Sequence, residues 1–173
     1  GASIRILAIQ PNEPEALLIK GLLALVRHKN NEALDYANRI LEAKANDEGG
    51  TILKSRALAA TRNLDGALEL IKSTIAATGY SRGLTLTLLE LDRAKGDQAG
   101  MQAAFERLMQ DKPNDHTVGT DYANFLYKVG RTDDARTLIY NQLLDPDFNN
   151  EDMLRVLCNL WKEYDPNPLT DAQ

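Results

Sequence analysis

Apolar positions follow helical spacing along the whole chain. Between Glu15 and Arg27 the apolar residues gather on one broad face with a period near 3.6 residues, and Lys20 lies off that face. From Asn31 to Lys44 a narrower apolar stripe is typical of an amphipathic helix. The same pair of patterns recurs as far as the carboxy-terminal region. Together they predict helices over 15–27, 31–44, 48–61, 65–77, 82–95, 98–111, 116–129, 133–145 and 150–164.

Similar residues return every 34 positions. Three such series are Leu7, Leu41, Ile75, Met109 and Leu143; Ala37, Ile71, Phe105 and Ile139; and Ala33, Ala67, Met101 and Ala135. A fixed period of this length is the signature of a stacked helical repeat. One pair of helices cannot bury its apolar stripe alone, so its stability depends on stacking against neighbouring pairs.

Residues between the predicted helices support these boundaries. Short polar residues stand where the second helix of each pair begins. Their side chains can accept hydrogen bonds from the free N–H groups at a helix start. These residues are Asn30 or Asn31, Asn63 or Asp65, Asp97, and Thr132. Gly96 and Gly130 follow first helices, at points where a left-handed residue is favoured. The connections are short, which predicts that neighbouring helices are antiparallel.

Composition narrows the class of protein. The chain has 173 residues, of which 43% are hydrophobic and 26% charged, and its net charge is −5. This balance predicts a folded domain, and the acidic total argues against nucleic-acid binding. No apolar stretch is long enough to predict a transmembrane segment, and the first residues do not resemble a signal peptide. A soluble protein of the cytoplasm or of a periplasm fits equally well.

Candidate chemical residues are few. Cys158 is the single cysteine, so it predicts neither an internal disulfide nor a zinc cluster, and we interpret it as a packing residue. His28 and His116 have no cysteine or acidic partner at ligand spacing and are expected at a loop or a helix start. Phosphate-binding glycine loops and the common nucleophile and zinc-protease motifs are absent.

One segment partly matches a calcium loop. Acidic and amide residues alternate from Asp145 to Glu151, but Asn150 replaces the central glycine and Val156 stands where a bidentate Glu is needed. We interpret the segment as a solvated turn before a helix. The sequence therefore predicts no catalytic, cofactor-binding or metal-binding residues, and the protein is not expected to be an enzyme.

The repeat resembles the tetratricopeptide repeat. The clearest copy, 14–47, has small and apolar residues in the slots characteristic of that family: Leu17, Gly21, Ala24, Ala33, Ala37 and Ile40. Later copies depart from the pattern at Ser55 and Leu89 (for Gly), Met101 (for Ala) and Asp92 (for a large apolar residue). We expect Gly21 and Ala33 to let the two helices of a pair approach closely.

The resemblance implies an all-α, right-handed superhelical solenoid of antiparallel helix pairs. A single repeat domain would span 1–173 as part of a longer protein, with a partial repeat at 3–13, repeats at 14–47, 48–81, 82–115 and 116–149, and a terminal helix at 150–164. The apolar residues Ile4, Ile6 and Ile9 would belong to the partial repeat.

By the same resemblance, the first helices line a concave groove that binds a protein or peptide partner. The slots facing the groove are Leu18, Leu22, Leu25, Ile52, Arg56, Leu86, Glu90, Arg93, Thr120, Asn124, Tyr127 and Lys128. Cys158 and Trp161 extend the row, unless the last helix buries them as a cap. An alternative is that Leu18, Leu22 and Leu25 cover an upstream repeat that is missing from this chain, or pack within their own repeat.

Three functions remain open at this point. The first is a non-catalytic interaction module, without cofactors, that binds a peptide, a helix or a subunit in the groove. The second is a self-assembling scaffold, and thus a possible homo-oligomer, within a larger bacterial envelope or secretion protein. The third is the regulatory domain of an enzyme. The family's clamp for acidic carboxy-terminal peptides is missing, because Leu18, Leu22 and Glu90 occupy slots that hold Lys, Asn or basic residues there.

Overall fold

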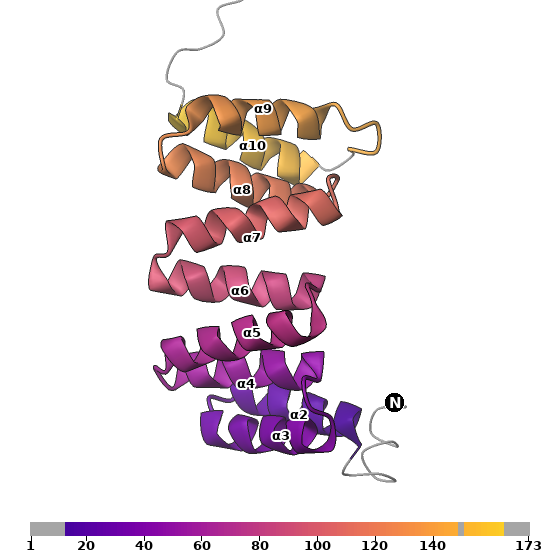
Figure 1. Ribbon diagram of the computed structural model, residues 1–173. Helices are drawn as coiled ribbons and strands as arrows, with labels where there is room; N and C mark the ends of the chain where they lie inside the picture. Colours follow the sequence, from indigo (N-terminus) through magenta and orange to yellow (C-terminus); the bar gives the residue numbers. More distant parts are fainter. Residues whose placement is uncertain (1–12, 149–150, 165–173) are drawn as a thin grey trace, which may run out of the picture. The chain divides into compact units, whose positions relative to one another are not determined.

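The computed structural model describes residues 13–148 and 151–164, and every regular element among them is an α-helix (Figure 1). The boundaries lie within two residues of those predicted from the sequence. The partial repeat at 3–13, with Ile4, Ile6 and Ile9, lies outside the described residues apart from Glu13. The helices are α2 (Pro14–Val26), α3 (Asn30–Ala43), α4 (Glu48–Ala60), α5 (Leu64–Thr78), α6 (Arg82–Lys95), α7 (Gln98–Asp111), α8 (His116–Lys128), α9 (Thr132–Leu143) and α10 (Glu151–Tyr164).

The chain divides into two compact units, Gly1–Ala104 and Phe105–Gln173. In the amino-terminal unit each helix from α2 to α6 packs against the next, and α4 also contacts both α2 and α6. The first helices α2, α4 and α6 therefore form one row. In the carboxy-terminal unit α8 packs against α9, and α10 contacts both of them. Helix α7 contributes residues to each unit.

The turn inside each helix pair has the same backbone geometry. His28, Arg62, Gly96 and Gly130 are 34 residues apart, and their φ angles of 58°, 66°, 77° and 83° are all left-handed. The residue that follows each of them donates its N–H to a carbonyl five residues earlier, as Asp97 does to Asp92 at 2.9 Å. This is the Schellman arrangement, which satisfies carbonyl groups at the end of the helix. It confirms the predicted roles of Gly96 and Gly130.

Helix starts agree with the sequence only in part. Asn63 and Asp97 accept hydrogen bonds from the N–H groups of Gly66 and Gly100, both at 3.0 Å, as predicted. The predictions for α3 and α9 are wrong, because their N-cap positions hold Lys29 and Arg131, which make no capping hydrogen bond through their side chains.

A second capping series was not predicted. Asp47, Ser81 and Asp115, again 34 residues apart, each accept a hydrogen bond from the N–H group three residues later and so begin α4, α6 and α8. These residues fix the starts of the first helices, which carry the candidate binding surface.

Small residues mark the points of closest packing. Ala33, Ala67 and Ala135 are completely buried, as their spacing predicted. Gly21 acts differently from the expectation, because a Cβ atom placed on it would clash with the Leu53 side chain of α4. Gly21 therefore permits the approach of first helices in neighbouring repeats, whereas the prediction assigned it to the contact within one pair.

Candidate binding surface

The row of first helices in the amino-terminal unit brings several predicted groove residues together. Arg56 on α4 and Glu90 on α6 form an ion pair, with Nη2 and Oε1 3.1 Å apart. The two residues are 34 positions apart, so equivalent slots of successive repeats lie side by side on this face. Both side chains are exposed, and such pairs contribute little to stability. The pair therefore marks an open polar surface.

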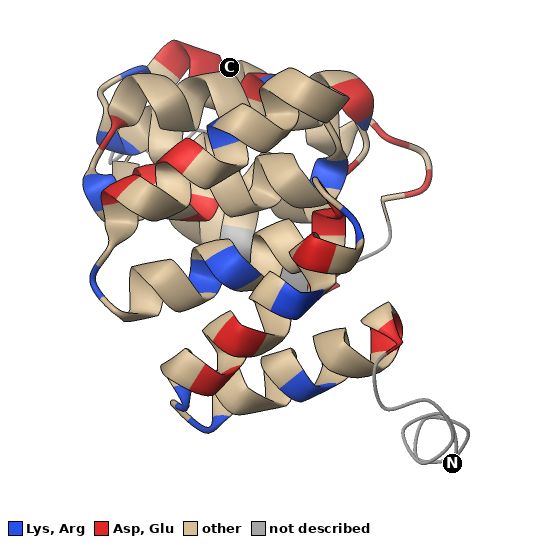
Figure 2. Ribbon diagram, turned by 60° about the horizontal axis from the view of Figure 1, so that its bottom comes forward, with Lys and Arg blue, Asp and Glu red and all other residues tan. Residues whose placement is uncertain are grey.

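Helix α2 carries the most apolar part of this unit's surface. Ile19, Leu22, Leu23 and Val26 are 44%, 40%, 46% and 76% exposed, and their spacing places them on one stripe of the helix. Glu15 and Lys20 are the two charged residues within α2, and the helix next to the grey amino-terminal trace is mostly tan in Figure 2. We call these four residues the α2 stripe.

The other predicted residues of this unit are less exposed. Leu18 and Leu25 are half-buried against the core around Leu17 and Leu53, so of the three predicted leucines only Leu22 is open. Ile52 packs partly against the core between α5 and α6. Leu86 is half-buried, and Arg93 is exposed near the end of α6.

In the carboxy-terminal unit the groove prediction fails at two positions. Tyr127 is only 4% exposed, and its ring stacks on Tyr164 of α10 with centroids 4.8 Å apart. Thr120 is also buried, and its hydroxyl donates to the carbonyl of His116 at 2.7 Å. The physical reason for burying Tyr127 is that α10 packs against α8 and covers its slot. Asn124 is half-buried and Lys128 is exposed.

A separate apolar pocket of about 380 Å³ lies between α9 and α10, and its α10 side consists of Leu157, Cys158, Trp161 and Lys162. Cys158 is exposed there, whereas the sequence predicted a packing residue. Trp161 is half-buried, and the exposed Tyr140 and Leu143 of α9 complete the outer wall.

His116 has partners that its sequence neighbourhood does not reveal. It is the first residue of α8, as expected, and its Nδ1 lies 2.6 Å from Gln142 Oε1 while Nε2 lies 2.9 Å from Asp145 Oδ2. Gln142 also donates to the carbonyl of Pro113 at 3.1 Å. The network ties the start of α8 to the end of α9. Among the described residues no group of His, Cys, Asp or Glu is arranged to hold a metal ion.

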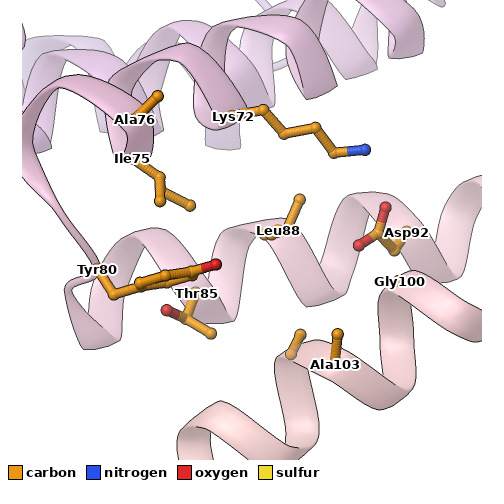
Figure 3. A pocket seen from close by; sticks show the side chains of 10 residues that line it. Lys72, Ile75, Ala76, Tyr80, Thr85, Leu88, Asp92, Gly100 and Ala103 are labelled. Atoms are coloured by element: carbon orange, nitrogen blue, oxygen red, sulfur yellow. The ribbon is translucent and has the colours of Figure 1, made fainter.

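A pocket of about 490 Å³ opens between α5, α6 and the start of α7 (Figure 3). Its walls are mostly apolar and include Ile75, Leu88, Ala103 and Ala104. One charged group is buried in them: Asp92 is 1% exposed, and neither of its carboxylate oxygens has a hydrogen-bond partner. Figure 3 shows Asp92 and the exposed Lys72 at the same end of the pocket.

The surroundings of Asp92 perturb its ionisation. Burial raises the pKa of its carboxyl group, and the charge of Asp97 acts in the same direction, while Lys72 and Lys95 oppose the shift. The carboxyl group also lies against the backbone of α7, because a Cβ atom on Gly100 would come within 2.6 Å of Asp92 Oδ2. Glycine at position 100 thus leaves space for this carboxyl group.

Comparison with solved structures identifies the fold. A thermophilic tetratricopeptide-repeat protein from Thermus thermophilus superposes with a TM-score of 0.72 at 19% identity, over 91% of this chain and 86% of that one. YrrB, described as a tetratricopeptide-repeat protein with an unusual peptide-binding site, gives 0.63 at 12% identity, over 97% and 94%. MamA gives 0.64 at 17% identity, over 82% and 83%. No protein-family model and no curated protein sequence matches this chain.

The fold is that of a tetratricopeptide-repeat array. Within this fold, Asp92 occupies a slot of the first helix where a large apolar residue is usual. The sequence showed that departure, but it gave no sign that α5 and α7 leave a pocket beside the residue. None of the described helices is both long enough and apolar enough to cross a membrane.

Proposed function

We propose that this chain is a non-catalytic protein-interaction module that binds a peptide or helix of a partner along its first helices. The observation that carries the proposal is the α2 stripe, whose four large apolar side chains are exposed together. Contiguous apolar surface of this kind marks interaction sites in proteins that otherwise bury such residues. An amphipathic helix packs against a partner through apolar residues at this spacing.

The neighbouring helices supply polar groups beside this anchor. Arg56 and Glu90 offer a hydrogen-bonding pair that a partner can engage, and Leu86 and Arg93 continue the row on α6. The peptide-binding site described for YrrB supports the proposal, because it shows that this fold can present one. The partner-binding residues we propose are therefore Leu22 and Val26 as anchors, with Ile52, Arg56, Leu86, Glu90 and Arg93 setting register and specificity.

The test compares single variants in quantitative binding. A partner or peptide selected with the parent chain is titrated against Leu22→Asp, Val26→Asp and the control Glu69→Lys, which alters an exposed residue of α5. Each α2 variant should weaken binding by more than about 1 kcal/mol, and the control should change it little. Circular dichroism checks that all variants are folded. Binding lost in the control and retained in both α2 variants would assign the interaction to another face.

A second candidate is self-assembly, which two apolar surfaces favour. The α2 stripe and the pocket between α9 and α10 both present apolar side chains to solvent, so copies of the chain could associate through them. Light scattering over a range of concentrations separates the two functions. A monomer that binds peptide supports the first. A concentration-dependent oligomer that Leu22→Asp dissolves supports the second.

A further inference from the structure

We propose that the pocket between α5, α6 and α7 is a binding site for a primary ammonium group carried on a short apolar chain, with Asp92 as the acceptor. The site is separate from the α2 stripe. Three features carry the inference: an unpartnered carboxylate, a space large enough for a ligand beside it, and apolar walls around the remainder.

The carboxylate provides the recognition chemistry. Both oxygens of Asp92 are buried without a donor, and leaving an ionised group in this state is costly. Asp92 lies near the first turn of α7, yet it accepts no N–H group there, because Asp97 already accepts that of Gly100. A role in capping α7 therefore does not explain why an aspartate is buried at position 92. An ammonium group has three donors and a full positive charge, which makes it a strong partner for a buried carboxylate.

The apolar walls of the pocket favour a ligand whose remaining part, apart from the ammonium group, is apolar. Ile75, Leu88, Ala103 and Ala104 offer aliphatic contacts, and Thr85 commits its hydroxyl to the carbonyl of Ser81 at 2.7 Å. A pocket that is mostly apolar with one placed polar group is the usual form of a small-ligand site. The same chemistry is found in a free alkylamine and in the lysine side chain of a protein partner.

Lys72 provides an internal competitor for the site. Its charge lowers the pKa of Asp92, and Figure 3 shows both side chains at the same end of the pocket. A cationic ligand would have to enter against this charge. Removing the charge while keeping an unbranched apolar chain, as in Lys72→Met, should therefore strengthen binding.

The test titrates the full chain with n-butylamine and follows backbone amide signals by NMR. Signals of α5, α6 and the start of α7 should shift, and the neutral isostere n-butanol should cause much smaller changes. Asp92→Asn keeps the shape of the side chain and should weaken butylamine binding at least about tenfold. Lys72→Met should strengthen it. Glu69→Gln, which removes an exposed acid of α5 outside the pocket, should leave the affinity unchanged.

A second arm identifies the source of the ammonium group. Nα-acetyl-lysine N-methylamide is compared with the same compound acetylated at Nε. Binding of the first and not the second, with the same response to Asp92→Asn and Lys72→Met, supports a protein-borne lysine; binding of butylamine alone supports a free amine.

Three outcomes would overturn the proposal: equal affinity of parent and Asp92→Asn, weaker binding by Lys72→Met, or shifts confined to other helices. Leu22→Asp should not affect butylamine, so failure here is distinguishable from failure of the proposed function.

Discussion

A carboxyl group that loses its water and gains no hydrogen bond resists ionisation, and Asp92 is such a group. Its pKa is raised above the ordinary value of 3.8 in the folded protein. The folded state therefore holds this proton more tightly than the unfolded state does. As the pH rises from the unfolded pKa through the folded one, Asp92 lowers the free energy of unfolding.

Asp92→Asn removes this effect. We expect the stability of the variant, relative to the parent, to increase with pH over that window and to stay constant above it. The measurement is urea unfolding of both proteins from about pH 3 to about pH 8. Asp47 and Asp65, whose pKa values are lowered, are present in both proteins and cancel in the difference. A difference that does not vary with pH would contradict the prediction.

The residues with left-handed φ angles in the turns allow a second prediction at the level of single residues. Gly96 adopts its φ of 77° without steric cost, whereas Arg62 holds a φ of 66° in the equivalent turn with a full side chain. Gly96→Ala should therefore lower the free energy of unfolding by about 1 kcal/mol, and Arg62→Gly should raise it by a smaller amount.

The control for this test is Arg27→Gly. Arg27 follows α2 with an ordinary φ of −88°, so the added glycine relieves no strain and only increases the entropy of the unfolded chain. Arg27→Gly should destabilise the protein. The same sign of change in Arg27→Gly and Arg62→Gly would show that the left-handed conformation is not strained.

Helix pairs depend on small residues where two helices pack most closely. Ala33, Ala67 and Ala135 are completely buried, and a larger side chain at these positions forces its neighbours apart. Ala33→Leu, Ala67→Leu and Ala135→Leu should each cost about 1–3 kcal/mol of stability, measured by thermal or urea unfolding. Ala43→Leu places the same side chain at an exposed position of α3 and should be nearly neutral. Equal effects at Ala33 and Ala43 would show that α3 is not packed tightly.

The sequence predicted the helices well because periodicity is a local property. A period of 34 residues placed Ala33 and Gly96 in their roles without any knowledge of long-range contacts. Contacts between helices distant in the chain were harder to predict. Tyr127 was assigned to an open groove because the family resemblance places its slot on the concave face, but α10 covers it with Tyr164. Asp145 was not recognised as a partner of His116, since 29 residues separate them.

The candidate sites also combine features that a local sequence pattern predicts with features that depend on contacts between helices distant in the chain. The α2 stripe includes Leu22, which the slot pattern predicted, and also Ile19 and Leu23, which it did not. The pocket at Asp92 depends on how α5 and α7 pack on either side of α6. The sequence shows which residue occupies a slot, but the pocket beside that residue is visible only in the packed structure.

A substitution in this chain should lower stability locally, because each repeat of such an array contacts only the neighbouring repeats. Unfolding free energy in such arrays is close to a sum of repeat and interface contributions. Helices α2 to α4 belong to the amino-terminal unit and α8 to α10 to the carboxy-terminal unit. Ala33→Leu disturbs the packing of α3 against its neighbours α2 and α4, so its effect should be confined to the unit that contains them.

Hydrogen exchange under native conditions measures this directly. In Ala33→Leu we expect faster amide exchange throughout α2, α3 and α4, and unchanged exchange in α8, α9 and α10. Ala135→Leu provides the matched experiment, because it fills the equivalent slot of α9 and should accelerate exchange in α8, α9 and α10 instead. Equal acceleration of every helix by either variant would show that the two units unfold as a single cooperative structure, and the stability of this chain would then not be a sum over its repeats.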